Sequence, residues 1–279
     1  ATFLEMLDGQ KRYFLKKDIA QFDRYKYALD DEFRSLNTDF FDLVHARYIQ
    51  RRNEAELFYT ELLEKPFDYS KNEEIDLDYE DQGYPITLRQ RSEKWRKQLK
   101  FSTLNIVHSK LEEEEKRAEK DTSYQPKLFD ELEAEARQIT RENLENYFSL
   151  MEDVRDEDWF GSYLNAFVSQ FDPHSVYFAP VDKDRFDASM SGKYEGIGAR
   201  LTKRNQSIKI VEIISGGPLW RDQSIDVGDQ IMMVRQEEGD RVDVQSMRLD
   251  DAIELIKGPE GTTVFITVKK VDSIPFSFE

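Results

Sequence analysis

The spacing of apolar residues changes near residue 190, and this change divides the chain into two regions of different fold class. Up to that point apolar side chains recur every three or four residues between long polar faces, as in amphipathic α-helices. From Tyr194 onward, short β-rich segments alternate with glycine-containing turns, which is typical of a small, mostly β domain. The sequence therefore predicts an α+β multidomain chain, with an all-α helical domain over 1–190 and a small mostly-β domain over 191–272.

Five helices are predicted in the first region, where proline and polar segments separate the apolar stripes. They are expected over 18–33, over 38–64, from after Pro85 to the acidic run 112–115, from after Pro126, and from Trp159 to Phe171. Asp18 is predicted to be the N-cap of the first helix, and Pro66 closes the second because proline cannot continue a helix.

Five β-rich segments and one short helix are predicted in the second region. The β-rich segments are 197–201, 208–214, 230–234, 242–244 and 262–268. The helix is expected over 250–257, and Gly258 and Pro259 end it.

Composition excludes several classes of protein. The 57 acidic and 40 basic residues give a net charge of −17, which argues against a nucleic-acid-binding or anionic-membrane-binding surface. Hydrophobic residues make up 39%, with 19 Phe and 13 Tyr, which is enough to build a core. The absence of cysteine excludes disulfides, thiolate zinc sites and cysteine nucleophiles. Neither a membrane span nor a signal peptide is recognisable in this chain.

Residues 196–199 read Gly-Ile-Gly-Ala and lead into a predicted strand. A dinucleotide-binding loop would need a third glycine and a following helix, but Leu201 and strand-like sequence come next here. Two glycines at this spacing allow successive backbone N–H groups to face one concavity, which can bind a carboxylate. From these residues alone, an anion-binding loop and a plain glycine-rich turn both remain open.

No metal site or cofactor is predicted. The acidic segment 73–81 lacks the glycine and the final glutamate of a calcium-binding loop, which favours a solvated loop. The three histidines, at positions 45, 108 and 174, lack metal-ligand spacing and are interpreted as structural.

The second region contains four notable blocks: Glu195-Gly196-Ile197-Gly198-Ala199, Ile214-Ser215-Gly216-Gly217-Pro218, Ile225-Asp226-Val227-Gly228-Asp229-Gln230-Ile231 and the run from Leu249 to Thr262. Together these blocks resemble the circularly permuted PDZ domain of C-terminal processing peptidases, the tail-specific proteases. They occur in the family's order. Leu219-Trp220 departs from the family, which usually has a small residue after Gly-Pro.

The resemblance extends upstream of the PDZ-like blocks. The segments 7–15 and 171–178 are similar to the helical N-terminal region of the long tail-specific proteases. The family cleaves proteins near their C-termini with a Ser nucleophile and a Lys general base that lie beyond the PDZ domain. The resemblance therefore implies no catalytic residue in this chain, and 273–279 as the start of a linker toward a protease domain. Ser191, Ser215 and Ser246 have no nucleophile context.

The resemblance also implies where a ligand binds. Gly196, Ile197, Gly198 and Ala199 would bind a peptide carboxylate, and the strand from Ala199 to Lys203 would pair with the peptide. The expected groove residues are Leu201, Leu249, Ile253 and Ile256. Helical spacing places the last three on one face, where they could equally be core residues. In PDZ domains the first residue of this helix, here Leu249, faces the ligand side chain two positions before the terminus.

This interpretation leaves two functions open. In the first, the chain is the substrate-recognition part of a periplasmic or otherwise extracytoplasmic tail-specific serine protease, and it binds apolar C-termini of unfolded or tagged proteins. A protein adaptor on the helical domain is a further expected partner. In the second, the chain is a non-catalytic scaffold that binds C-termini or an adaptor. A Ser and a Lys encoded downstream of residue 279 in the parent reading frame would distinguish the first function from the second.

Overall fold

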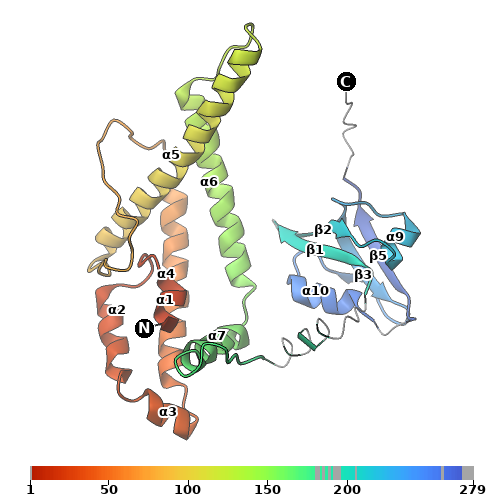
Figure 1. Cartoon of the computed structure of the whole chain (residues 1–279), viewed down its shortest axis with the longest axis horizontal. Coiled ribbons are helices and arrows are strands. Elements are labelled where there is room, and N and C mark those ends of the chain that lie inside the picture. Colours follow the sequence, from red (N-terminus) through yellow and green to blue (C-terminus); the bar gives the residue numbers. More distant parts are fainter. Residues whose placement is uncertain are drawn as a thin grey trace. The chain divides into compact units, whose positions relative to one another are not determined.

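The structure, a computed structural model, describes residues 2–179, 183, 186–187, 190, 196–204, 206–258 and 261–271. The chain forms two compact units (Figure 1). One comprises Ala1–Phe148 and Val154–Tyr177, and the other comprises Ser149–Asp153 and Phe178–Glu279. Most residues around the predicted boundary near 190, and the predicted linker 273–279, lie outside the described residues, so both stay predictions.

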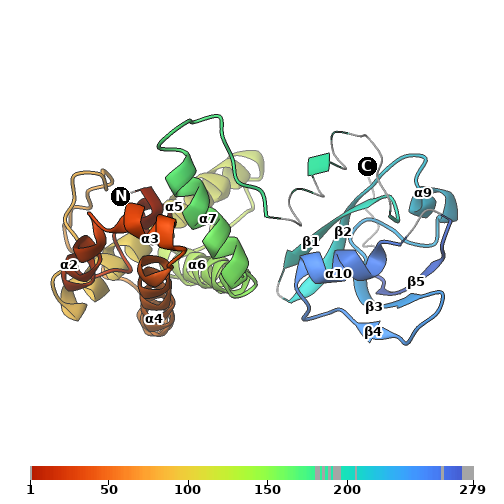
Figure 2. The same ribbon diagram turned by 90° about the horizontal axis from the view of Figure 1, so that it is seen from below.

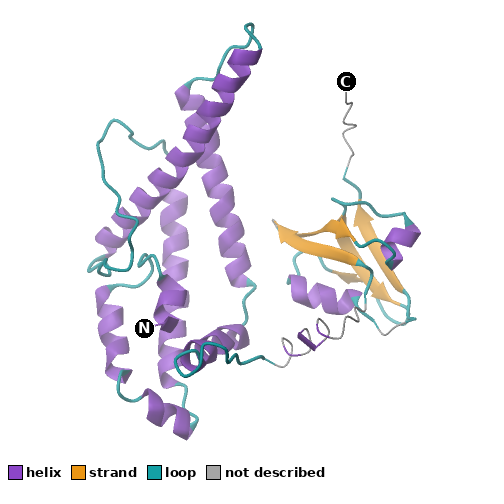
Figure 3. Cartoon of the chain, viewed as in Figure 1, coloured by secondary structure: helices purple, strands orange, loops and turns teal. Residues whose placement is uncertain are grey.

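The first unit is helical. Its elements are α1 (Thr2–Asp8), α2 (Lys16–Phe22), the 3₁₀ turn η1 (Asp23–Tyr25), α3 (Leu29–Ser35), α4 (Asp39–Leu62), α5 (Leu88–Lys120), α6 (Phe129–Glu152) and α7 (Asp156–Val168). The long helices α4, α5 and α6 dominate this unit in Figure 3. The hydroxyls of Thr103 on α5 and Thr140 on α6 lie 3.0 Å apart in a buried contact, which joins these two helices.

Four details of the helical prediction are corrected. The expected helix over 18–33 is divided into α2, η1 and α3, and α1 was not predicted. Asp18 is not the N-cap of α2. Leu15 holds that position, and Asp18 accepts its N–H at 2.9 Å from within the first turn. Helix α5 continues past the acidic run to Lys120, and Glu114 of that run turns inward, where it accepts hydrogen bonds from the Tyr124 hydroxyl and the Lys127 N–H.

The core of the helical unit is rich in aromatic side chains. Trp95 and Phe14 are fully buried, and edge-to-face ring contacts join Tyr13 to Tyr48 and to Trp95. The Trp95 indole N–H donates to the Arg12 carbonyl at 2.9 Å, so this large side chain is both packed and hydrogen-bonded. The segment 7–15 that carries the family resemblance is therefore part of the core.

Buried charges in this unit are held by several partners. Asp18, with no exposed surface, accepts hydrogen bonds from Arg51 at 2.8 and 2.9 Å. Asp8 accepts the N–H groups of Arg12, Tyr13 and Phe14 at 2.7 to 3.0 Å. Burial nevertheless raises the pKa of Asp8 to about 6, because these hydrogen bonds compensate only part of its lost hydration.

The second unit is a small antiparallel sheet with short helices. Its described elements are β1 (Ala199–Arg204), β2 (Ser207–Ile213), α9 (Pro218–Asp222), β3 (Gln230–Gln236), β4 (Val242–Asp243), α10 (Leu249–Ile256) and β5 (Val264–Lys269). The sheet runs β1-β2-β3-β4, and β5 pairs with β3. These strands match the predicted segments to within a few residues.

The core of the second unit is aliphatic and lies between the sheet and α10. Its most buried members include Ile208, Ile210, Ile231 and Ala252. The short helix α9, which the sequence did not predict, buries Leu219 in this core and leaves Trp220 about half exposed. The unusual Leu-Trp pair therefore fits the fold: the first residue packs and the second faces solvent.

Candidate functional site

The glycine loop before β1 requires its glycines. Gly196 and Gly198 have φ values of 141° and 74°, which L side chains rarely adopt. At Gly198 space is also lacking, because an added Cβ would lie 3.0 Å from the Gly217 Cα and 3.2 Å from the Pro218 Cδ. The first and second glycine blocks of the sequence are thus packed against each other.

The contacts of this loop fix its carbonyl groups and leave two N–H groups open. The Ile197 carbonyl accepts the Leu219 N–H at 3.0 Å, and the Gly198 carbonyl accepts the Ile214 N–H at 2.9 Å. Within the described residues, the N–H groups of Ile197 and Gly198 have no protein acceptor. Backbone donors strongly favour a partner, so an acceptor from a ligand suits this position.

Strand β1 borders the loop and offers a free edge. Among the described strands it pairs only with β2, in antiparallel register from Ala199 opposite Ile213 to Arg204 opposite Ser207. A register irregularity lies between Arg200 and Leu201. Figures 1 and 2 show α10 lying beside β1. The strand edge and the helix together provide what an added peptide strand needs.

The four predicted groove residues differ in burial. Leu201 on β1 and Leu249 on α10 are half-buried and pack against the edge of the aliphatic core. Ile253 is half-buried and is not among the described side chains packed on that core. Ile256 is 3% exposed and belongs to the core, so it can contribute only to the floor of a groove.

Comparison with known proteins identifies both units. The family model described as the tail specific protease N-terminal domain matches residues 1–181, and the PDZ domain model matches residues 187–269. The chain belongs to the tail-specific protease family. Its helical unit is the tail-specific protease N-terminal domain, and its sheet unit is a PDZ domain.

The chain is similar to several curated proteases. It is 28% identical over 272 residues to the tail-specific protease of Haemophilus influenzae, covering 96% of this chain and 36% of that protein. It is 29% identical over 152 residues to the carboxy-terminal processing protease CtpA of Bacillus subtilis, covering 54% of this chain and 30% of that protein. The chain thus spans about a third of the length of these relatives.

One solved structure is the PDZ domain of a carboxy-terminal protease from Vibrio cholerae in complex with a peptide. It is 43% identical in sequence, covers 26% of this chain and 76% of that chain, and has a TM-score of 0.26.

A residue that the sequence analysis did not single out also borders the PDZ loop. An added Cβ at Gly196 would lie 3.8 Å from the Lys257 Cγ, so the side chain of Lys257 passes beside the glycine loop. Lys257 comes directly after α10 and is exposed. The sequence offers little signal for this contact, because the two residues lie in blocks separated by most of the domain.

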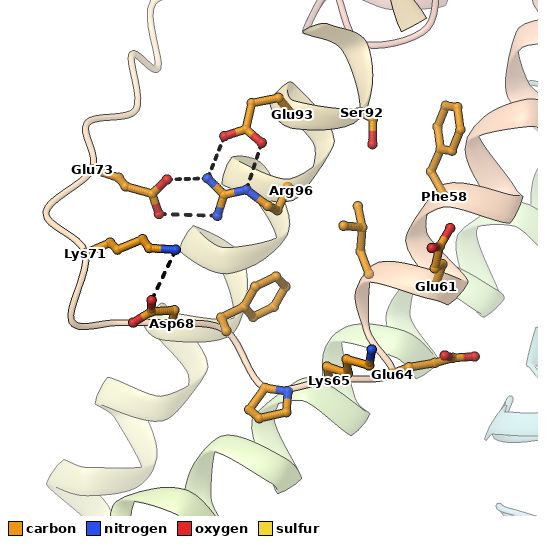
Figure 4. A pocket seen from close by; sticks show the side chains of 13 residues that line it. Phe58, Glu61, Glu64, Lys65, Asp68, Lys71, Glu73, Ser92, Glu93 and Arg96 are labelled. Carbon is orange, nitrogen blue, oxygen red and sulfur yellow. Dashed lines mark hydrogen bonds and ion pairs between the residues drawn. The ribbon is translucent and has the colours of Figure 1, made fainter. Parts of the chain in front are cut away.

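The tail-specific protease N-terminal domain contains a separate cavity of about 620 Å³ (Figure 4). It lies between the end of α4, the following segment and the start of α5. Phe58, Leu62 and Phe67 supply apolar surface, and charged residues surround them. One wall is fixed by ion pairs: Arg96 contacts Glu73 and Glu93, and Lys71 contacts Asp68. Glu73, part of the predicted acidic loop, thus forms an ion pair with the side chain of Arg96.

Metal sites and membrane-spanning helices are both absent from the described part of the chain. Within it, no group of three or more His, Cys, Asp or Glu side chains is arranged to hold a metal ion. No described helix is both long enough and apolar enough to span a membrane. His45 stacks on Phe41, with ring centroids 5.3 Å apart, in keeping with the structural role predicted for it.

Proposed function

We propose that this chain is the substrate-recognition part of a C-terminal processing serine protease, and that its PDZ domain binds apolar protein C-termini. The observation that carries the proposal is the pair of open N–H groups, on Ile197 and Gly198, at the start of an open strand edge. A terminal carboxylate supplies acceptors for both donors, and the peptide backbone that precedes it supplies partners for β1.

The groove selects the ligand by its apolar wall. Leu201, Leu249 and Ile253 line the space between β1 and α10 in this proposal, and Ile256 forms its floor. Gly196 and Ala199 complete the loop on either side of the two donors. Burial of apolar ligand side chains contributes affinity in proportion to the area removed from water. The proposed substrates are unfolded or tagged proteins, whose C-termini are free to extend along the strand.

The chemical step belongs to other parts of the protease in this proposal. By resemblance, a Ser nucleophile and a Lys base downstream of the PDZ domain cleave the bound protein, and this chain alone is inactive. The compartment is periplasmic or otherwise extracytoplasmic. Incubation of the chain with an unfolded protein that has an apolar C-terminus should yield no cleavage product by mass spectrometry. Cleavage that copurifies with the chain would contradict this.

We extend the proposal to a protein adaptor that docks on the helical domain. The cavity beside α4 and α5 supports it, because it joins an apolar floor to a charged rim. A photoreactive amino acid at Lys65, on the rim, should crosslink to the adaptor in the native host. The same group at Lys26, an exposed position outside the cavity, should not give that product.

The decisive experiment compares a peptide that ends in apolar residues with its C-terminal amide, by fluorescence anisotropy. Hydrogen bonds to a charged group contribute about 1.5 to 3 kcal/mol, so the free acid should bind roughly 10- to 150-fold more tightly. Equal affinities would reject carboxylate recognition. A non-catalytic scaffold remains the second candidate, and a parent reading frame without downstream Ser and Lys would favour it.

A further inference from the structure

Lys257 lies beside the proposed carboxylate loop. Its aliphatic stem approaches the Cα side of Gly196, where an added Cβ would be 3.8 Å from the Lys257 Cγ. A lysine side chain extends three further atoms beyond Cγ, to the ammonium nitrogen. The ammonium therefore comes within reach of an anion bound to the N–H groups of Ile197 and Gly198.

The backbone of Lys257 is held in place on both sides. Its N–H donates to the Ile253 carbonyl at 2.8 Å, and its carbonyl accepts from the Gln236 amide at 3.0 Å. The same Gln236 nitrogen also donates to the Leu255 carbonyl, at 2.5 Å. Lys257 itself has φ −70° and ψ 147°, so the helix ends there and the chain becomes extended. The side chain thus starts from a fixed point beside the loop.

Lys257 has no carboxylate partner among the described residues, in contrast to Lys203 and Lys270 of the same unit. Lys270 lies 2.8 Å from both Asp226 and Asp229, and Lys203 lies 2.5 Å from Asp153. For Lys257, no ion pair occurs within the part of the chain that the structure describes. In a chain with net charge −17, such a lysine beside two open N–H donors is suited to an external anion.

We propose that Lys257 is a specificity-determining residue that recognises the negative charge of the ligand's terminal carboxylate. This inference rests on the proposed function. The N–H groups of the loop can donate to any carbonyl-type oxygen, including that of an amide, whereas the ammonium favours only a charged terminus. Lys257 would also offset the negative end of the α10 dipole, which lies at the same end of the groove. The ligand class is therefore free C-termini, as opposed to internal or amidated segments.

The test measures two peptides against matched variants by fluorescence anisotropy at low and high ionic strength. The peptides share one apolar sequence and end in a free carboxylate or an amide. An exposed ion pair contributes up to about 1 kcal/mol, so Lys257→Met should weaken binding of the acid about three- to fivefold. Binding of the amide should stay unchanged. Lys257→Arg should retain the preference for the acid, and Lys257→Glu should reduce it further than Lys257→Met.

Lys269→Met is the matched control, because Lys269 is an exposed lysine on β5, which pairs with β3. It removes the same charge from the domain and should leave both affinities unchanged. High salt should weaken binding of the acid to wild type more than to Lys257→Met. Circular dichroism should show that all variants remain folded.

The outcomes separate the inference from the proposed function. If wild type prefers the acid and Lys257→Met keeps the whole preference, Lys257 does not recognise the charge, while carboxylate binding by the loop stands. If Lys257→Met weakens binding of the acid peptide and of the amide peptide equally, the residue acts through packing and the inference fails. If wild type binds both peptides equally, the proposed carboxylate site itself is wrong.

Discussion

The buried carboxylates of the helical domain and the glycine loop of the PDZ domain differ in how their hydrogen-bonding groups are paired. In the helical domain, buried carboxylates such as Asp18 and Asp8 are surrounded by arginine side chains and backbone N–H groups of the same domain. In the PDZ domain, the N–H groups of Ile197 and Gly198 have no acceptor among the described residues. Satisfied polar groups stabilise a fold, and open donors at a fixed position are available to a ligand.

The two domains also differ in the side chains that form their cores. Aromatic rings fill the helical core, where Trp95 contacts Tyr13 and Tyr48 contacts Trp159 edge to face. The PDZ core consists of aliphatic side chains, with Ile208 and Ile231 at its centre. In the proposed function, the helical domain has a structural and docking role, and the PDZ domain binds the ligand. Substitutions in each domain can test that division.

The largest expected effect is on the helical domain. Asp18→Ala removes one of the two carboxylate partners of buried Arg51, which keeps Glu54 at 2.9 Å, and also removes the acceptor of the Leu15 N–H. Breaking a buried ion pair from one side typically costs about 3 to 5 kcal/mol when the remaining charge has no other partner. Because Arg51 keeps Glu54, we expect a loss of about 3 kcal/mol, at the lower end of that range. Hydrogen exchange measured by mass spectrometry should show loss of protection in α2 and α4, with the PDZ strands unchanged.

Asp30→Ala is the control, since Asp30 is an exposed acid on α3 of the same domain. It should change the free energy of unfolding by less than about 0.5 kcal/mol. Equal effects of the two substitutions would show that the Asp18–Arg51 pair does not hold the domain together.

The second prediction concerns how stability depends on pH. One buried carboxylate in each domain is expected to change stability with pH, and the two changes have opposite signs. Asp8 has a folded pKa of about 6 against an ordinary 3.8, so between these values the folded state binds more protons. This group therefore lowers the stability of the helical domain as pH rises from 4 to 6, by about 3 kcal/mol at most. Asp8→Asn should remove that contribution, seen as a smaller difference between denaturation midpoints at pH 4 and pH 7.

Asp229 of the PDZ domain should behave in the reverse way. Burial alone would raise its pKa, but hydrogen bonds from the Asp226 N–H and Lys270 hold the pKa below its ordinary value. Its stabilising contribution is present above pH 3.8 and is lost as the pH falls through the lowered value. Lys270→Met should make the PDZ domain unfold at a higher pH on acidification. A PDZ domain that gains stability below pH 4 would contradict the assignment.

The elements of the molecule could be predicted where one periodicity continues over many residues. Helices α4 and α6 match their apolar stripes closely, and the PDZ strands match the segments between the glycine blocks. Short α1 and α9 lack enough turns to show a period. Asp18 fits the pattern of an N-cap, but the neighbouring arginines that hold it come from α4 and are not visible locally. For the same reason, spacing located the glycine loop but could not reveal its contact with Lys257.

The third prediction separates crowding from backbone conformation in the PDZ loop. Gly198 and Gly216 both have positive φ, of 74° and 82°, but only Gly198 would place a Cβ against backbone atoms. Gly216→Ala should cost about 1 kcal/mol, and Gly198→Ala about 2 kcal/mol more because the loop must move from Gly217. Urea denaturation measures stability, and the acid peptide should bind more weakly only to Gly198→Ala. Equal loss of affinity in both variants would argue against a fixed loop.

The smallest expected effect is ligand selectivity at Leu249, and it tests whether α10 forms the groove wall. Leu249 cannot accept or donate a hydrogen bond, so an apolar ligand residue two positions before the terminus should be preferred. Each additional buried methylene contributes about 0.8 kcal/mol, or roughly fourfold in affinity. A peptide series with Ala, Val, Leu, Ser or Asp at that position should rank Leu and Val first and Asp last.

Leu249→Ser should flatten this ranking of peptide affinities. Val227→Ser is the control, at a position 59% exposed on a turn outside the proposed groove, and it should preserve the ranking. A wild-type preference for Ser, or an unchanged ranking in Leu249→Ser, would place Leu249 in the core and remove α10 from the proposed site.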